Sequence, residues 1–254
     1  MTQEREPIIQ VRNLCYEVSG HRILRDVSFD VYEGEIFGVM GMSGSGKSTL
    51  LKILMGLIPA CGGDVIIGGR SILGYSEHEL MKLRTDMGMC FQYSALFDSM
   101  TVADNVAFGL RRRARLSKEE IGTRVTQHLA EVGLHDVEGN MPAELSGGMR
   151  KRVSIARELI LRPKILLYDE PSAGLDPIMS AVIDDVITDL RDRFGITSMV
   201  VTHEVEELFA IADRVMMIHG GVVAACDVPE ALRETPNDVV EQFVRGSAVG
   251  PIRV

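Results

Sequence analysis

The stretch Gly41-Met42-Ser43-Gly44-Ser45-Gly46-Lys47-Ser48-Thr49 fits the pattern of a phosphate-binding loop, in which a glycine, four further residues and Gly-Lys-Ser/Thr follow one another. The apolar run over 36–40 before it predicts a short buried strand, and leucine and isoleucine recur at helical spacing after it. The loop therefore stands between a predicted strand and a predicted helix, which is the context that this motif needs.

The composition of this loop suits a triphosphate. Its glycines let successive backbone N–H groups wrap an anion at close range. The helix that begins near Lys47 points its positive dipole end at the same place. We expect Lys47 to add a charge on the β- and γ-phosphates and the Ser48 hydroxyl to ligate Mg²⁺. A turn that binds nothing has no need of the Lys-Ser pair, so the loop predicts nucleotide binding.

Length and composition indicate a folded chain with one large domain. The 254 residues suffice for one α/β domain with an inserted lobe, and 46% hydrophobic with 25% charged residues argue against disorder. The net charge of −9 speaks against broad binding of DNA or RNA. The four cysteines are far apart, so we expect neither a zinc site nor a disulfide framework. We expect no signal peptide and no membrane span, so partners must bring the chain to any membrane.

The rest of the chain alternates predicted strands and helices, with one interruption. Strands are predicted over 8–18 and 27–32, and a small hairpin is predicted from 64 to 70. From about 93 to 150 the pattern is helical only, which predicts an inserted helical lobe. Near the end, 229–243 predicts one or two short helices and 246–254 a loose extension.

Tyr16 lies near the end of the first predicted strand, about 25 residues before the phosphate loop. Its ring could stack on an adenine base, because every purine offers a π-face. A strand tyrosine that only packs against its neighbours is the other interpretation. The residue alone leaves both open.

Polar residues stand at the ends of three predicted buried strands: Gln92, the pair Asp169 and Glu170, and His203. Successive strand residues point opposite ways, so one carboxylate can hold a metal while the other faces a water. In a phosphate-loop ATPase, Asp169 would bind Mg²⁺ and Glu170 would orient or deprotonate the attacking water. His203 would sense the γ-phosphate, and Gln92 would contact both metal and water. Together these residues predict the second half of a catalytic pocket.

Several motifs, taken in order, resemble the ATPase subunit of an ABC transporter. They are the phosphate loop, Gln92, Leu145-Ser146-Gly147-Gly148, Tyr168-Asp169-Glu170-Pro171, Gly174-Leu175-Asp176 and His203. The resemblance covers nearly the whole chain. It implies an α/β phosphate-loop core with a mainly parallel sheet, an N-terminal antiparallel β subdomain and the helical insert over about 93–150. It also implies an ABC ATPase domain over 1–246 with a C-terminal extension over 247–254.

The resemblance further implies a homodimer. In this family two ATPase domains pack head to tail and bury two ATP molecules between them. Ser146-Gly147-Gly148 would then reach the γ-phosphate bound to the opposite subunit, as an anion site at a helix N-terminus can. By the same resemblance Asp176 would lie at the dimer contact, Tyr16 would stack on adenine, and Gln92 would couple the site to a membrane permease.

Met149 departs from the family pattern, because the usual fifth residue of the signature is glutamine. The change removes a polar group near the dimer interface. The variant signature with Arg150-Lys151-Arg152, the run Glu170 to Ile178 and the ending Gln242 to Pro251 nevertheless resemble one branch, the Mla/Mce-type lipid transporters. That resemblance implies a peripheral ATPase on the cytoplasmic face of the bacterial inner membrane, together with a permease and an Mce-domain lipid-binding protein.

Three functions are therefore in competition. The leading one is a homodimeric ATPase that powers phospholipid movement between bacterial membranes. An import ATPase for a polar solute, such as an amino acid, is the alternative from a neighbouring branch. A third is a non-transport ABC protein that acts on DNA or ribosomes, which the single phosphate loop and the acidic balance disfavour.

Overall fold

A computed structural model describes residues 6–113 and 116–253. The N-terminal part of the chain forms a small antiparallel sheet. Its strand order is β2-β1-β4-β5, made of β1 (Pro7–Val18), β2 (His21–Tyr32), β4 (Gly62–Ile67) and β5 (Arg70–Ser71). Buried and more exposed residues alternate along much of β1 and β2, as expected when one face covers a core. This sheet is the antiparallel β subdomain that the family resemblance implies.

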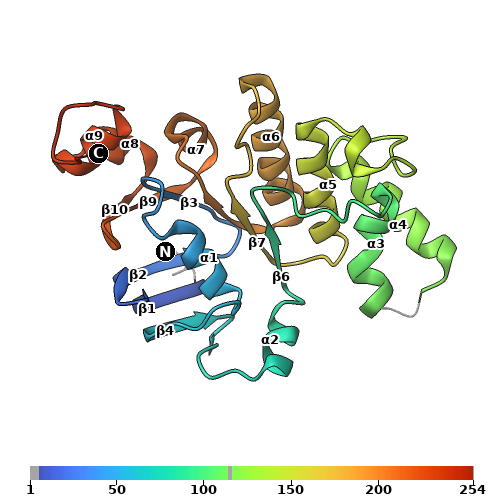
Figure 1. The fold of residues 1–254 in the computed structure, drawn as a ribbon, viewed down its shortest axis with the longest axis horizontal. Helices are drawn as coiled ribbons and strands as arrows, with labels where there is room; N and C mark the ends of the chain where they lie inside the picture. The colour runs from blue at the N-terminus through green and yellow to red at the C-terminus, as the bar shows by residue number, and fades with distance from the viewer. Residues whose placement is uncertain (1–5, 114–115, 254) are drawn as a thin grey trace, which may run out of the picture.

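The larger sheet has the strand order β10-β9-β3-β8-β7-β6 (Figure 1). Its strands are β3 (Ile36–Met40), β6 (Met87–Cys90), β7 (Ile165–Asp169), β8 (Thr197–Val201), β9 (Arg214–His219) and β10 (Val222–Asp227). The strands from β9 to β6 run parallel, and β10 is antiparallel to β9. Every residue of β3, β6, β7 and β8 is buried, because both faces of these strands are covered.

Two apolar cores lie on the two faces of this sheet. On one face, α1 (Lys47–Leu54) packs between the parallel sheet and the antiparallel sheet. On the other face lie α6 (Pro177–Phe194) and α7 (Val205–Ile211), with α5 (Gly147–Leu159) of the helical insert. A short helix, α2 (Glu77–Leu83), precedes β6. Among the described residues, no helix combines the length and the apolar character needed to cross a membrane.

The helical insert forms a lobe beside the sheet, on the side away from the antiparallel strands (Figure 1). It contains α3 (Val102–Arg113), α4 (Lys118–Glu131), a 3₁₀ turn (Pro142–Glu144) and α5 (Gly147–Leu159). Ser117 caps α4 as predicted, accepting a hydrogen bond of 3.2 Å from the Glu120 amide. Because α5 is one unbroken helix, the proposed boundary at residue 150 falls inside it.

The C-terminal segment corrects one expectation. Two short helices, α8 (Pro229–Arg233) and α9 (Asp238–Val244), occupy the predicted region. The residues after them are not a loose extension, because Ile252 is 8% exposed and packs into the core. The buried Gln242 side chain accepts from the Ile252 amide at 2.7 Å and donates to the Ser247 and Ile252 carbonyls at 3.2 Å. Contacts between Gln242 and residues five and ten positions further along an irregular segment leave no periodic signal in the sequence.

Candidate active site

The predicted phosphate loop joins β3 to α1 and forms the floor of a cleft of about 970 Å³. The cleft opens at the C-terminal ends of the parallel strands, where ligands bind in α/β folds. It is lined by Tyr16, Val18, Ile23, Met42, Ser43, Gly44, Gly46, Lys47, Ser48, Thr49, Lys52, Ile58, Gln92, Glu170, His203 and Phe243. The fold thus brings Tyr16, most of the loop, Gln92, Glu170 and His203 to one place.

The backbone of the loop leaves hydrogen-bond donors for an anion. Gly44 and Gly46 have φ of 77° and 102°, which glycine adopts without the steric cost that a side chain brings. No side chain caps the N-terminus of α1, and its first turn carries no acidic residue. Its first N–H groups therefore meet the cleft without a side-chain acceptor, and this arrangement fits a phosphate.

Two loop members do not line the cleft. A Cβ at Gly41, whose φ is 151°, would collide with the carbonyl oxygen of Ile218 on β9, so glycine is needed there for packing. The Ser45 hydroxyl is buried and has no hydrogen-bond partner among the described residues. Gly41 and Ser45 thus help to pack the loop against the rest of the fold and do not face the cleft.

Lys47 is buried, and its ammonium donates to the carbonyls of Gly41 at 2.7 Å and Met42 at 3.0 Å. Burial lowers the pKa of Lys47, while the nearby carboxylates of Glu170 and Asp169 oppose that shift. Both of its partners are neutral. A phosphate can therefore displace them and gain a charge-assisted interaction.

Ser48 and Asp169 form a ready pair of oxygen ligands. The Ser48 hydroxyl donates to Oδ1 of Asp169 at 2.8 Å. Burial raises the pKa of Asp169, and the Ser48 hydrogen bond works against this rise. Hydroxyl, carboxylate and amide oxygens suit a hard cation such as Mg²⁺, so these two residues and Gln92 of the same cleft could hold it beside the phosphates.

Glu170 and His203 face each other across the ends of β7 and β8. His203 Nδ1 lies 2.9 Å from Oε2 of Glu170, whose side chain is 13% exposed. Glu170 has a φ of 51°, in the left-handed region that a side chain makes unfavourable. Its amide donates to the Val201 carbonyl at 2.8 Å, which helps to hold this conformation. The predicted water-facing carboxylate is thus oriented by both its backbone and its histidine neighbour.

Part of the cleft lining is apolar. Tyr16, Val18 and Ile23 of the antiparallel sheet and Phe243 of α9 all contribute to it. Sequence reasoning missed Phe243, because nothing in a short C-terminal helix indicates that it returns to a cleft lined by residues about 200 positions earlier. Two aromatic rings, rather than one, therefore line the cleft, and a base could stack on such a ring.

The signature segment lies outside this cleft in a single copy of the chain. Ser146 caps α5, accepting from the Met149 amide at 3.2 Å. A Cβ at Gly148 would lie 2.5 Å from Cε of Met179, so this glycine allows close packing against α6. Asp176 caps α6 by accepting from the amides of Ile178 at 3.0 Å and Met179 at 3.1 Å.

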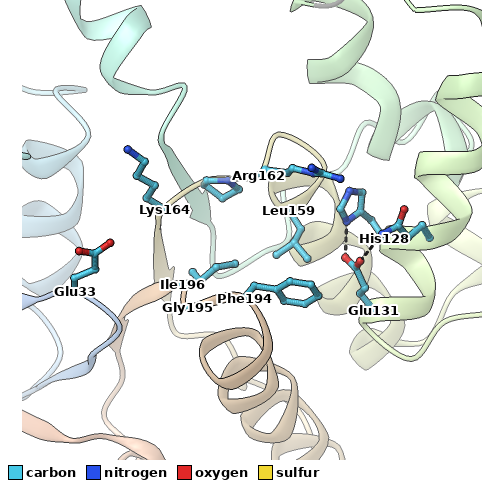
Figure 2. A pocket seen from close by; sticks show the side chains of 11 residues that line it. Glu33, His128, Glu131, Leu159, Arg162, Lys164, Phe194, Gly195 and Ile196 are labelled. Carbon is cyan, nitrogen blue, oxygen red and sulfur yellow. Dashed lines mark hydrogen bonds and ion pairs between the residues drawn. The ribbon is translucent and has the colours of Figure 1, made fainter.

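A second cleft, of about 480 Å³, opens at the opposite ends of the parallel strands (Figure 2). Glu33, Lys164 and Ile196, which precede β3, β7 and β8, line it together with side chains of α4. There His128 Nδ1 lies 2.5 Å from Oε2 of Glu131, and both side chains are less than a tenth exposed. Sequence reasoning did not predict this cleft, because its walls come from four distant segments.

The glycine-rich loop leads into the uncapped N-terminus of α1, close to the carboxylates of Asp169 and Glu170. This arrangement places the chain in the class of phosphate-loop nucleotide-binding proteins. The sequence pattern described as ABC transporter matches residues 24–173, and the chain belongs to this family. The match confirms the family that the motifs indicate, and with it the prediction of an ATP-binding, ATP-hydrolysing cassette.

Two curated relatives match nearly the full chain. One is the intermembrane phospholipid transport system ATP-binding protein MlaF of Haemophilus influenzae, 38% identical over 97% of this chain and 93% of that protein. The other is the probable ribonucleotide transport ATP-binding protein mkl of Mycobacterium leprae, 39% identical over 96% of this chain and 70% of that protein. The two are equally similar to this chain, although their names describe different cargo.

A solved structure confirms the fold class. It is the dimeric post-hydrolysis state of the ATP-binding cassette MJ0796 bound to ADP and Pi. It superimposes with a TM-score of 0.80 at 31% identity, covering 87% of this chain and 98% of that one. The α/β core with a parallel sheet, an antiparallel β subdomain and a helical insert is therefore that of an ABC ATPase.

Proposed function

We propose that this chain is the ATPase subunit of a transporter that moves phospholipid between bacterial membranes. The observation that carries the proposal is the similarity to MlaF, which extends over 97% of this chain and 93% of the relative. The signature Leu145 to Met149 and the ending Gln242 to Pro251 support the same branch. The ATPase core does not choose the cargo, so the lipid assignment depends on this similarity.

The working unit in this proposal is a homodimer on the cytoplasmic face of the inner membrane. A permease spans the membrane, and an Mce-domain protein handles lipid on the far side. The dimeric MJ0796 cassette supports the pairing of two subunits. Ser146-Gly147-Gly148 then faces the ATP of the other subunit, and Asp176 lies near the contact. This arrangement gives the two helix N-termini a role that one copy lacks.

ATP binding uses donors that are free or weakly held. Lys47 turns from its two carbonyls to the β- and γ-phosphates, and the N–H groups of Ser43 to Thr49 surround them. Tyr16 stacks on the adenine. Ser48, Asp169 and Gln92 would hold Mg²⁺, which when bound neutralises developing charge on the phosphates.

Hydrolysis needs a base and a group that keeps the base in place. Glu170 takes a proton from the attacking water while the water oxygen bonds to the γ-phosphorus and the bond to ADP breaks. His203, 2.9 Å from that carboxylate, fixes its orientation and reaches the γ-phosphate side of the cleft. Gln92 orients the water and reports the state of the site to the permease.

The cargo is tested by purifying the tagged protein from its native membrane in mild detergent. Copurifying proteins and bound lipid are then identified by mass spectrometry. A small permease, an Mce-domain protein and phospholipid are the expected result. A different permease with a solute-binding protein would contradict the lipid assignment and leave the ATPase chemistry intact.

The name of the mkl relative favours a second candidate, a transporter for a polar solute such as a nucleotide. The same purification separates the two candidates. For direct comparison, ATPase activity of the purified complex is measured with phospholipid vesicles and with ribonucleotides other than ATP. Stimulation by the vesicles alone supports lipid transport, and stimulation by the solute alone supports the second candidate.

A further inference from the structure

The basic run Arg150-Lys151-Arg152 has a structural use that the sequence comparison did not indicate. Neighbouring helix residues point about 100° apart, so three cations in a row leave α5 in three directions. Arg150 donates to the Leu145 carbonyl at 2.5 Å, and Arg152 donates to the Gly133 carbonyl at 2.9 Å beyond α4. Lys151 is the member that points toward the catalytic strands.

Lys151 joins α5 to two residues of the active site. Its ammonium donates to the backbone carbonyl of Gln92 at 2.6 Å and to that of Glu170 at 3.0 Å. These two residues follow β6 and β7, which pair directly in the sheet. One cation therefore connects the signature helix with two of the three strand ends that carry catalytic polar groups.

The environment of Lys151 is unusual for a lysine. It is 8% exposed, and its ammonium donates to two neutral carbonyls, as that of Lys47 does. Among the described lysines, none forms a salt bridge within 4.0 Å. Burying an ammonium without a carboxylate at contact distance is costly, and burial lowers the pKa of Lys151. Such a charge contributes little to stability, so a functional reason for it is expected.

Lys151 does not line the nucleotide cleft, whereas Lys47 does. It therefore acts through the residues that it holds. At Glu170 it completes the fixation of a left-handed backbone: the Glu170 amide is bound to Val201 and its carbonyl to Lys151. A carboxylate on such a backbone keeps its position only while both neighbours are in place.

We propose that Lys151 is a positioning residue that makes the rate of ATP hydrolysis depend on how α5 is seated against Gln92 and Glu170. The proposal rests on the proposed catalytic roles of those two residues. When α5 is seated, Glu170 is held at the attacking water and Gln92 at the metal side. When α5 moves away, both carbonyls lose their donor together, and the base is released before the nucleotide is.

Arg157 provides a matched control on the same helix. It donates to the carbonyls of Ala95 at 2.6 Å and Ser94 at 3.4 Å, in the loop that follows Gln92. It thus ties α5 to that loop with the same kind of cation-to-carbonyl contact, and no hydrogen bond joins it to Glu170 among those of the described residues. A comparison of the two positions separates a general anchoring of the loop from control of the base.

The experiment compares the full-length Lys151→Met, Lys151→Arg and Arg157→Met proteins, each purified with the membrane partners that remain bound. Turnover is expressed per nucleotide-binding site, and affinity is measured with a fluorescent ATP analogue. We expect Lys151→Met to lower kcat at least about tenfold with the nucleotide Kd changed by less than about twofold. Lys151→Arg should recover most of the rate, because a guanidinium can serve both carbonyls. Arg157→Met should stay within about threefold of the unchanged protein.

Hydrogen exchange supplies a second measurement that does not depend on turnover. Lys151→Met should speed exchange at the amides of 91–95 and at those of Glu170 and Ser172, and Arg157→Met only at 91–95. If Lys151→Met folds poorly, Lys151→Gln, whose amide can still donate, is compared in its place and should show a smaller loss of the same kind.

An unchanged kcat, equal losses at both positions, or a Kd that worsens as much as kcat would overturn the proposal. Its failure is distinguishable from failure of the proposed function. The cargo is read from copurifying proteins and lipid, and the role of Glu170 is read from its own Gln variant.

Discussion

The two clefts of this molecule differ in how their polar groups are used. In the nucleotide cleft, the start of α1 has no side-chain cap and Lys47 is held only by neutral carbonyls. In the cleft of Figure 2, the two buried titratable side chains, His128 and Glu131, bind each other. A cleft can bind an anion when its donors are free or replaceable, and cleft size alone does not reveal this.

Glu-to-Gln changes in the two clefts should give the largest contrast. We expect Glu170→Gln to lower kcat by about 1,000-fold or more, because an amide cannot accept the proton of the attacking water. ATP binding should persist, since the loop and Lys47 remain. Phosphate release and equilibrium nucleotide binding measure the two effects. Glu131→Gln is the matched control and should leave kcat within about threefold; an active Glu170→Gln protein would refute the assignment of the base.

Removing one cation from each cleft tests which of them is the nucleotide site. Lys47→Ala should weaken ATP binding about 100-fold, which corresponds to about 2.7 kcal/mol, because a charge-assisted contact to phosphate is lost. Arg162→Ala, at the second cleft, should change the Kd by less than about twofold. Titration with a fluorescent ATP analogue measures both, and a similar loss in both variants would mean that the clefts are not functionally distinct.

Substitutions in the second cleft should change the stability of the protein, whereas those in the nucleotide cleft should change its ATPase activity. Glu131→Leu leaves buried His128 without its partner and should lower the free energy of unfolding by about 2 kcal/mol. The double change with His128→Leu should recover more than half of that loss, because neither member of the buried pair is then left unpaired and the exposed Gln127, which also donates to Glu131, can bind water. Chemical denaturation measures these values. A double variant less stable than Glu131→Leu would show that the pair contributes more than its mutual hydrogen bond.

Asp184 extends the comparison to an acid that faces other acids. Burial, then the charges of Glu207 and Asp185, raise the pKa of Asp184 to about 7. The folded state therefore binds a proton that the unfolded state releases near its lower, ordinary pKa. The resulting stability is complete below that ordinary value and is lost as the pH rises through about 7.

Asp184→Asn should accordingly raise the free energy of unfolding most above pH 7. We expect its advantage at pH 8 to exceed that at pH 5 by about 1 kcal/mol, a value reduced for partial solvent screening. Urea denaturation at the two pH values measures the difference. An advantage that is equal at both pH values would mean that Asp184 titrates in the ordinary range.

The parts of the site that could be predicted are those that short sequence motifs identify. The loop at 41–49 and the acids at 169–170 each stand where a predicted strand ends, and the parallel sheet then brings them together. The sequence places Glu170 and His203 at neighbouring strand ends, but their 2.9 Å contact was not predicted. The same logic predicted the helical insert from 93 onward, because strand patterns are absent there.

Other features depend on contacts that no local pattern records. Phe243 joins the lining of the cleft from α9, and Lys151 reaches two strand ends from the interior of a helix. Gln242 orders the last residues through a single amide, so a segment with no helical or strand period is nevertheless packed. In each case one polar or aromatic side chain contacts a partner that is distant in sequence. The residue type of that side chain does not reveal which partner it contacts.

The unbroken course of α5 has a mechanical consequence. Thirteen residues form a rod about 20 Å long, with Ser146 at its beginning and Arg157 near its end. A tilt of about 10° about the first residue of this rod would move Lys151 by about 1 Å and Arg157 by about 2.6 Å. The helix is thus a lever: a small tilt at its signature end stretches the Lys151 contacts to Gln92 and Glu170, and displaces the end that holds the loop after Gln92 still further.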